Sequence, residues 1–189
     1  MNPISYWQRL KVAFQYVMPQ IYMTQAAGWL AKQKWGAVTH FVIKAFAKKY
    51  NIDMSIAEKE KFSDYASFNE FFIRPLKENA RPINQNTTAL CCPADGRVSE
   101  CGHIDDDRLL QAKGHFFSLN DLLAEDKALT ETFKNGEFIT TYLSPRDYHR
   151  VHMPCDGTLR KMIYVPGDLF SVNPFLAKHV PNLFARNER

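Results

Sequence analysis

The sequence predicts an α+β protein in which amphipathic helices come first and a mainly antiparallel, β-rich body follows. Up to about residue 50, apolar residues recur at the spacing of three and four that is typical of helices. From residue 80 onward, short apolar runs alternate with turn signals such as Asp-Gly and Asn-Gly, as expected for strands. Hydrophobic residues make up 46% of the 189-residue chain, enough to bury a core. Helices followed by strands indicate the α+β class.

Three helices are predicted in the N-terminal segment. The first covers Tyr6–Met18 and ends before Pro19, because proline disfavours helical geometry in the preceding residue. The second covers Gln20–Lys32 and the third Val38–Lys49, with Gly36 between them. On the third helix we expect one apolar face made of Phe41, Val42, Ala45 and Phe46.

The charge of these helices is strongly one-sided. Residues 1–50 contain no acid and carry +7, whereas the rest of the chain carries −3, which together give the net +4. Basic residues mixed with Trp and Tyr serve either nucleic acid or an anionic membrane surface, and the helical periodicity favours the membrane. An ordinary helical subdomain facing the core is the alternative. Because a one-sign face is unusual on a surface helix, we expect membrane association.

No stretch reaches the roughly 20 apolar residues needed to span a bilayer. Residues 1–8 also lack the features of a secretory signal. The expected location is therefore peripheral, on the cytoplasmic side of a membrane. The four cysteines show neither a disulfide framework nor a CxxC metal motif, which favours a reducing compartment.

Residues 51–66 are polar and acidic, and we interpret them as a linker. Residues 1–66 are thus a membrane-associating helical segment with its linker, and residues 67–189 are the body. Ser67 followed by Glu70 forms a capping box for a short helix from Phe68 to about Ile73. Ser118 with Asp121 caps a second short helix. The strands that we predict in the body are Ala89–Cys92, Arg97–Cys101, Glu137–Leu143 and Thr158–Val165.

The segment Thr141–Gly157 concentrates ionisable side chains between two of these predicted strands, and His149 and His152 lie at its centre. Three interpretations are open. With Cys155, the histidines have the spacing of a zinc site, although no fourth ligand is evident. They also suit structural roles. Alternatively they serve acid and base chemistry, for which the pKa of histidine is well placed.

An acid–base interpretation requires a carboxylate that orients the base. Asp95, in its Pro-Ala-Asp-Gly turn, is the best candidate, followed by Asp147 and Asp156, and it can equally be a turn residue only. A nucleophile is missing from the pattern. Ser144 and Ser171 have no supporting sequence context, and the chain lacks a Gly-x-Ser-x-Gly elbow.

Several long motifs resemble the bacterial phosphatidylserine decarboxylase family, and together they extend over nearly the whole chain. They are Phe68-Asn69-Glu70-Phe71-Phe72-Ile73-Arg74-Pro75-Leu76, Pro93-Ala94-Asp95-Gly96, Gln111-Ala112-Lys113-Gly114-His115, the stretch Tyr142–Cys155, Tyr164–Asn173 and Asn182–Arg189. The basic amphipathic start is also similar to the membrane-associating helices of that family.

The resemblance implies a proenzyme that cuts itself within a Leu-Gly-Ser-Thr motif and converts the serine into a pyruvoyl group. This chain contains no Gly-Ser pair and stops at Arg189 inside a family motif. We therefore expect an N-terminal fragment, with an incomplete body and with the pyruvoyl serine beyond Arg189. By resemblance, Asp95 orients His152, His152 activates the absent serine, and His149 supplies a proton during decarboxylation.

The expected activity is decarboxylation of phosphatidylserine to phosphatidylethanolamine at the cytoplasmic face of the bacterial inner membrane. The expected partners are an anionic membrane, the small pyruvoyl-bearing chain of the same precursor and a second copy of the chain, without nucleic acid. No metal is implied. The alternative is a non-catalytic protein that binds anionic lipid surfaces.

Overall fold

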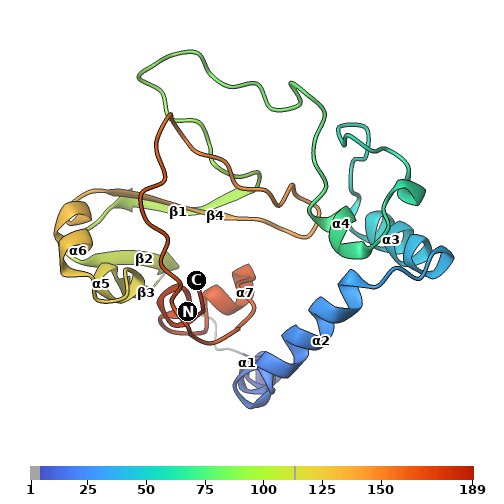
Figure 1. Ribbon diagram of the computed structural model, residues 1–189. Coiled ribbons are helices and arrows are strands. Elements are labelled where there is room, and N and C mark those ends of the chain that lie inside the picture. Colours follow the sequence, from blue (N-terminus) through green and yellow to red (C-terminus); the bar gives the residue numbers. More distant parts are fainter. Residues whose placement is uncertain (1–4, 113) are drawn as a thin grey trace. The chain divides into compact units, whose positions relative to one another are not determined.

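The computed structural model describes residues 5–112 and 114–189, so the start of the stretch 1–8 and Lys113 of the Gln111–His115 motif lie outside the described residues. The chain forms two compact units. The first consists of the N-terminal 24 residues with Val98–Tyr142 and Lys161–Arg189, and the second of Gln25–Arg97 with Leu143–Arg160. Helices and paired strands occur together (Figure 1), which confirms the α+β class.

The N-terminal helices follow the prediction closely. They are α1 (Tyr6–Val17), α2 (Gln20–Lys32) and α3 (Ala37–Tyr50). Ser5 caps α1 by accepting from the Gln8 amide, and the break between α1 and α2 lies at Pro19 as expected. Among the described residues, no helix is long and apolar enough to cross a membrane.

The core of the second unit lies against α3. Thr39, Ile43 and Ala47 are the buried residues of this helix, and their four-residue spacing places them on one face. Ile43 and Ala47 pack with Tyr65 and Phe71. Of the apolar face expected on this helix, Phe46 packs against this core, whereas Phe41 and Val42 are 73% and 46% exposed. A helix with two apolar faces cannot be assigned one core face from periodicity alone.

The segment that the sequence suggested as a linker contributes to this core. Ala57 and Tyr65 are fully buried, and a short 3₁₀ helix, η1 (Phe62–Asp64), packs on α3. The helix α4 (Phe68–Phe72) follows, with Ser67 accepting from the Glu70 amide as predicted. The Glu70 carboxylate accepts from the Ala66 amide instead of closing the box on Ser67.

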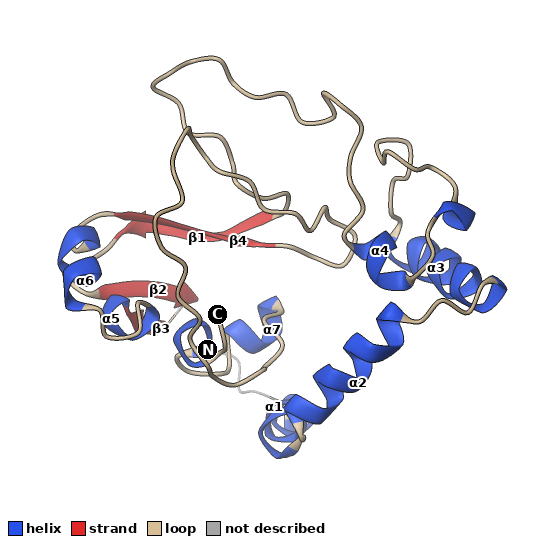
Figure 2. Ribbon diagram, in the orientation of Figure 1, coloured by secondary structure: helices blue, strands red, loops and turns tan. Residues whose placement is uncertain are grey.

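The first unit contains two two-stranded sheets (Figure 2). In one, β1 (Arg97–His103) pairs with β4 (Glu137–Tyr142), confirming two predicted strands. The Ile104 amide donates to the Gly136 carbonyl, and the Ser99 hydroxyl donates to the Thr140 carbonyl. Later residues of one strand thus lie beside earlier residues of the other, so the two strands run in opposite directions. The other is the antiparallel hairpin of β2 (Arg108–Ala112) and β3 (His115–Ser118), which the sequence interpretation missed.

Short helices complete the first unit. Ser118 caps α5 (Leu119–Leu122) as predicted, and α6 (Lys127–Phe133) follows. Near the C-terminal end, α7 (Pro174–Ala177) and α8 (Leu183–Arg186) were not predicted, because four-residue helices show no periodicity. Gln111 of β2, only 1% exposed, donates to the carbonyls of Ala177 and Val180 and accepts from the Leu183 amide.

Two predicted strands were wrong. Ala89–Cys92 and Thr158–Val165 have no regular secondary structure, and Figure 2 draws both as loops. Their large side chains are unburied: Leu90 is 76% exposed and Met162 is 89% exposed. An apolar run becomes a strand only when a partner takes up its backbone hydrogen bonds, and neither run has a partner strand among the described residues.

Candidate functional site

The predicted site residues all lie in the second unit. His149 and His152 belong to the loop Ser144–His152, called here the histidine loop, which follows β4. A tight turn starts this loop: the amide and the hydroxyl of Ser144 both donate to Asp147 Oδ2, each at 2.7 Å. This turn engages the Asp147 carboxylate, one of the two secondary candidates for orienting a base. The other, Asp156, is exposed.

His149 is held on both sides. Its ring stacks on Phe72 of α4, with centroids 4.1 Å apart and an interplanar angle of 24°. Its Nε2 is 3.1 Å from the Ser144 carbonyl oxygen, so this nitrogen bears the proton and donates. Burial lowers the pKa of His149, and the Arg74 cation adds to that shift, while the Ser144 bond and Asp147 oppose it. The imidazole is therefore neutral near pH 7, with Nδ1 as its unprotonated nitrogen.

His152 has a different environment. Its Nε2 lies 2.9 Å from the hydroxyl of Tyr148, and the two rings stack with centroids 5.5 Å apart. Tyr148 is buried, at 8% exposure. The His152 amide donates to the Pro93 carbonyl at 2.8 Å, which places the histidine loop beside the Pro93–Gly96 turn.

Asp95 lies in that turn, where its hydrogen-bond partner is Arg81. Arg81 Nε is 2.8 Å from Oδ1 and 3.0 Å from Oδ2, and Nη2 also donates to the carboxylate. This bidentate pair raises the pKa of Arg81. Among the described residues, no hydrogen bond joins the Asp95 and His152 side chains, and the backbone bond of His152 is to Pro93, two residues before Asp95. The role of Asp95 toward His152 stays a prediction.

Four contact residues of this site were missed at the level of sequence. Phe72, Arg74, Arg81 and Tyr148 all touch a predicted site residue or the histidine loop. Phe72 and Arg74 looked like part of a capped helix and its end, and Tyr148 like an ordinary aromatic residue. The only signal for Phe72, Arg74 and Tyr148 was membership of the motifs that resemble a known family, and Arg81 lies outside those motifs.

The zinc interpretation gains no support. In the described part of the chain, no group of three or more His, Cys, Asp and Glu side chains is arranged to hold a metal ion. Cys155 is exposed, and the contacts of the two histidines are to Phe72, Ser144 and Tyr148.

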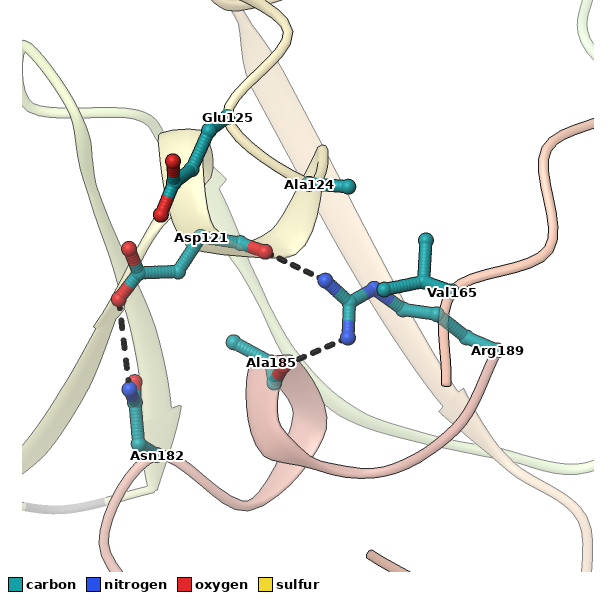
Figure 3. Close-up of a pocket in the computed structure, with 7 residues that line it drawn as sticks. All are labelled: Asp121, Ala124, Glu125, Val165, Asn182, Ala185 and Arg189. Atoms are coloured by element: carbon teal, nitrogen blue, oxygen red, sulfur yellow. Dashed lines mark hydrogen bonds between the residues drawn. The ribbon is translucent and has the colours of Figure 1, made fainter. Parts of the chain in front are cut away.

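The first unit has open pockets, and none of the predicted site residues line them. One, of about 310 Å³, is lined by Asp121, Ala124, Glu125, Val165, Asn182, Ala185 and Arg189. In Figure 3 the Arg189 guanidinium reaches the carbonyl oxygens of Asp121 and Ala185, while Asn182 reaches the Asp121 carboxylate. Because backbone carbonyls accept from most of the N–H groups of Arg189, this side chain has little donor capacity left for a ligand.

Comparison with known proteins assigns the chain to a family. A family model described as phosphatidylserine decarboxylase matches residues 68–189, and a second, described as PSD, matches residues 10–51. This chain belongs to the phosphatidylserine decarboxylase family. The phosphatidylserine decarboxylase proenzyme of Haemophilus influenzae (strain Rd) is 89% identical over 189 residues, which is 100% of this chain and 65% of that protein. The proenzyme of Pasteurella multocida (strain Pm70) is 80% identical over 186 residues, 98% of this chain and 63% of that protein.

The chain therefore spans slightly less than two thirds of the length of these relatives. Within this decarboxylase family, the matched region includes Asp95, His149 and His152. The family resemblance that the motifs indicated is confirmed.

Proposed function

We propose that this chain forms the histidine-bearing part of an enzyme that decarboxylates phosphatidylserine to phosphatidylethanolamine. The observation that carries the proposal is the 89% identity, along the whole chain, to a protein named as a phosphatidylserine decarboxylase proenzyme. Two histidines in different environments on one loop support it, because self-cleavage and decarboxylation make separate demands on acid–base groups.

The proposed cofactor is a pyruvoyl group on a small chain cut from the same precursor. Such a carbonyl supplies an electron sink for the pair left behind when carbon dioxide departs. The residues present fit its formation in one respect: His152 is hydrogen-bonded to a hydroxyl, that of Tyr148, so its Nε2 can engage an O–H group. A base that activates a serine needs that same contact.

In this proposal His152 is the base of self-cleavage and Asp95 its orienting carboxylate. In the structure, the Tyr148 hydroxyl is hydrogen-bonded to His152 Nε2, and Arg81 is paired with the Asp95 carboxylate. For His152 to take a proton from a serine, the Tyr148 hydroxyl must release Nε2. Asp95 can then accept from the other ring nitrogen while Arg81 retains one carboxylate oxygen.

His149 is proposed to deliver a proton to the carbon that loses carbon dioxide. Nε2 keeps its proton for the Ser144 carbonyl, so Nδ1 is the atom that takes up and passes on the mobile proton. Because burial lowers the pKa of His149, its protonated form is a stronger acid than an ordinary imidazolium. The group returns to the neutral form as soon as the proton has left.

The N-terminal helices are proposed to lie on an anionic membrane surface, where the substrate resides. Large apolar side chains on α1 to α3 are exposed: Trp7 73%, Phe14 60%, Tyr22 74%, Trp29 60% and Phe41 73%. Residues 1–50 contain seven basic residues and no acid. Apolar exposure next to positive charge suits the headgroup layer of a bilayer. We place this peripheral contact on the cytoplasmic face, with a second copy of the chain as a further candidate partner.

A chimeric proenzyme tests the proposed activity. The Haemophilus influenzae proenzyme carries this chain in place of its matched region, and we expect it to mature into two chains on a denaturing gel and to release carbon dioxide from phosphatidylserine. The parent proenzyme is the control. A chimera that is folded but neither cut nor active supports the alternative, a non-catalytic protein that binds anionic lipid surfaces.

Single substitutions in the same chimera distinguish the roles of the two histidines. His152→Ala should stay uncut, because the serine then lacks its base, whereas His149→Ala should be cut and fail in decarboxylation. Normal two-chain maturation of the His152→Ala chimera would refute the role of His152. An active His149→Ala chimera would refute the role of His149.

Sedimentation with liposomes tests the membrane contact. Binding should require anionic lipid and weaken with salt. Replacing Lys44, Lys48 and Lys49 by Gln should weaken binding about 100-fold, since each basic residue near an anionic surface contributes roughly 1 kcal/mol. A matched triple replacement at Lys127, Lys161 and Lys178 should change little. Equal effects of the two triples would contradict an interface on the N-terminal helices.

A further inference from the structure

The end of α4 and the histidine loop are joined by one ring stack and by two hydrogen bonds that run in opposite directions. Phe72 stacks on His149, with centroids 4.1 Å apart. Arg74 Nη2 donates to the Arg146 carbonyl at 3.1 Å, and Arg150 Nε donates back to the Ile73 carbonyl at 2.8 Å. Segments more than 70 residues apart in the chain are thereby fixed at three successive points.

Arg74 is an unusual member of this group because it is buried with its hydrogen bonds incomplete. The residue is 2% exposed, and its Nε and Nη1 find no hydrogen-bond partner among the described residues. Its guanidinium also lies 5.4 Å from the centre of the Phe71 ring. Burying an incompletely paired cation is unfavourable for folding, so stability alone does not account for an arginine here.

The electrostatic surroundings of Arg74 connect it to the site. Burial lowers the pKa of its guanidinium, while Tyr65, Asp147 and Asp95 favour the charged form. Two of these three groups are a predicted site carboxylate and the carboxylate that shapes the histidine loop. The charged groups that bear on His149 are in turn Arg74, from the end of α4, and Asp147, from its own loop.

We propose that Phe72 and Arg74 are positioning residues for His149, and that they hold its imidazole in one orientation by tying the histidine loop to the end of α4. This inference rests on the proposed function for the importance of His149, but the contacts themselves do not depend on it. Phe72 fixes the plane of the ring. Arg74 fixes the loop backbone three residues before it, at Arg146.

The test compares Arg74→Met and Phe72→Leu in the 189-residue chain, with Arg160→Met, an exposed arginine of the same unit, as the matched control. Nuclear magnetic resonance follows the His149 ring below the unfolding transition. Stacking on Phe72 shifts its ring protons upfield, so both variants should move them downfield. The pKa of His149 should rise toward its ordinary value in both, because the ring becomes more hydrated. The control should leave both quantities unchanged.

Thermal unfolding separates positioning from a merely structural role. Methionine fills much of the space of arginine and needs no hydrogen bonds, so the Tm of Arg74→Met should stay within about 3 °C of the unsubstituted chain. Arg74→Lys keeps a charge and one donor for the Arg146 carbonyl, and it should restore part of the His149 signal. A native His149 spectrum in Arg74→Met overturns the proposal, whatever the Tm.

In the chimeric proenzyme, Arg74→Met should reduce kcat for decarboxylation about 10-fold to 100-fold and leave KM nearly unchanged, as expected when a catalytic group is misplaced. If the unsubstituted chimera is inactive, the proposed function fails, whereas the resonance of His149 still decides the role of Arg74. If the chimera is active and Arg74→Met retains its kcat, the positioning role is refuted.

Discussion

Two buried polar side chains, one in each unit, differ in how completely they are paired. In the first unit, Gln111 of β2 is 1% exposed and makes three hydrogen bonds, to Ala177, Val180 and Leu183, which fix the C-terminal helices. In the second unit, Arg74 is 2% exposed and makes one such bond, to Arg146, with two nitrogens unpaired. The first arrangement stabilises a fold, and the second is one that stability alone would not maintain.

This difference distinguishes a contact that stabilises the first unit from a contact that belongs to the candidate site in the second unit. Around Gln111, a neutral amide satisfies carbonyl and amide groups of helix ends that would otherwise be buried without partners. Around Arg74, an incompletely paired cation contacts a loop with two histidines and is favoured electrostatically by the carboxylates of Asp147 and Asp95. Incomplete pairing at a cluster of titratable groups is typical of functional sites.

The largest effect is expected for Gln111→Leu. Leucine fills a similar volume but leaves the Leu183 amide and the carbonyls of Ala177 and Val180 without their partner. The free energy of unfolding should fall by about 3 kcal/mol or more, as measured by urea denaturation. Gln85→Leu, at an exposed position, is the control. A loss below about 1 kcal/mol would remove the basis of the comparison.

Ser67→Ala should have an intermediate effect. The Ser67 hydroxyl accepts from the Glu70 amide and caps α4, the helix that contains Phe72 and is followed two residues later by Arg74. Loss of an N-cap destabilises by about 1 kcal/mol. Because α4 contacts the histidine loop, amide hydrogen exchange should also accelerate in residues 144–152. Exchange that accelerates in α4 alone would show that the loop is held independently of the helix.

Tyr148→Phe tests the hydrogen bond between Tyr148 and His152 in the second unit. The substitution removes the hydroxyl at His152 Nε2 and keeps the ring stacking. We expect a loss of about 0.5 to 1 kcal/mol in the free energy of unfolding, since one partly buried hydrogen bond is removed. Tyr164→Phe removes a hydroxyl from an exposed contact with Glu188 and serves as the control. Equal losses would show that burial of Tyr148 adds nothing to its contact.

The smallest effect is a dependence of stability on pH. Burial depresses the pKa of His149 in the folded chain below its ordinary value of about 6.5. The unfolded chain therefore binds the proton more readily, so this contribution is complete above about pH 6.5 and is lost as pH falls through the folded pKa. The difference in stability between the unsubstituted chain and His149→Gln should shrink in that direction. A pH-independent difference would contradict a buried, neutral His149.

Much of the fold could be predicted because its signals are local. Pro19 ends α1, Ser67 caps α4, and Asn135 with a positive φ precedes β4. Each depends on backbone preferences of one or two residues. The runs Ala89–Cys92 and Thr158–Val165 were misjudged for the opposite reason, since a strand depends on a partner strand that can be far away in the sequence.

The features of the candidate site also fall into two groups, those that local sequence predicts and those that depend on packing. The sequence by itself determined the family, the two histidines on one loop, and the capped helix that starts after Ser67, because each is specified by adjacent residues. Only the tertiary structure decided that Asp95 pairs with Arg81, that Tyr148 contacts His152, and that Arg74 is buried beside the histidine loop. Burial and pairing between distant segments are products of packing, and no local preference specifies them.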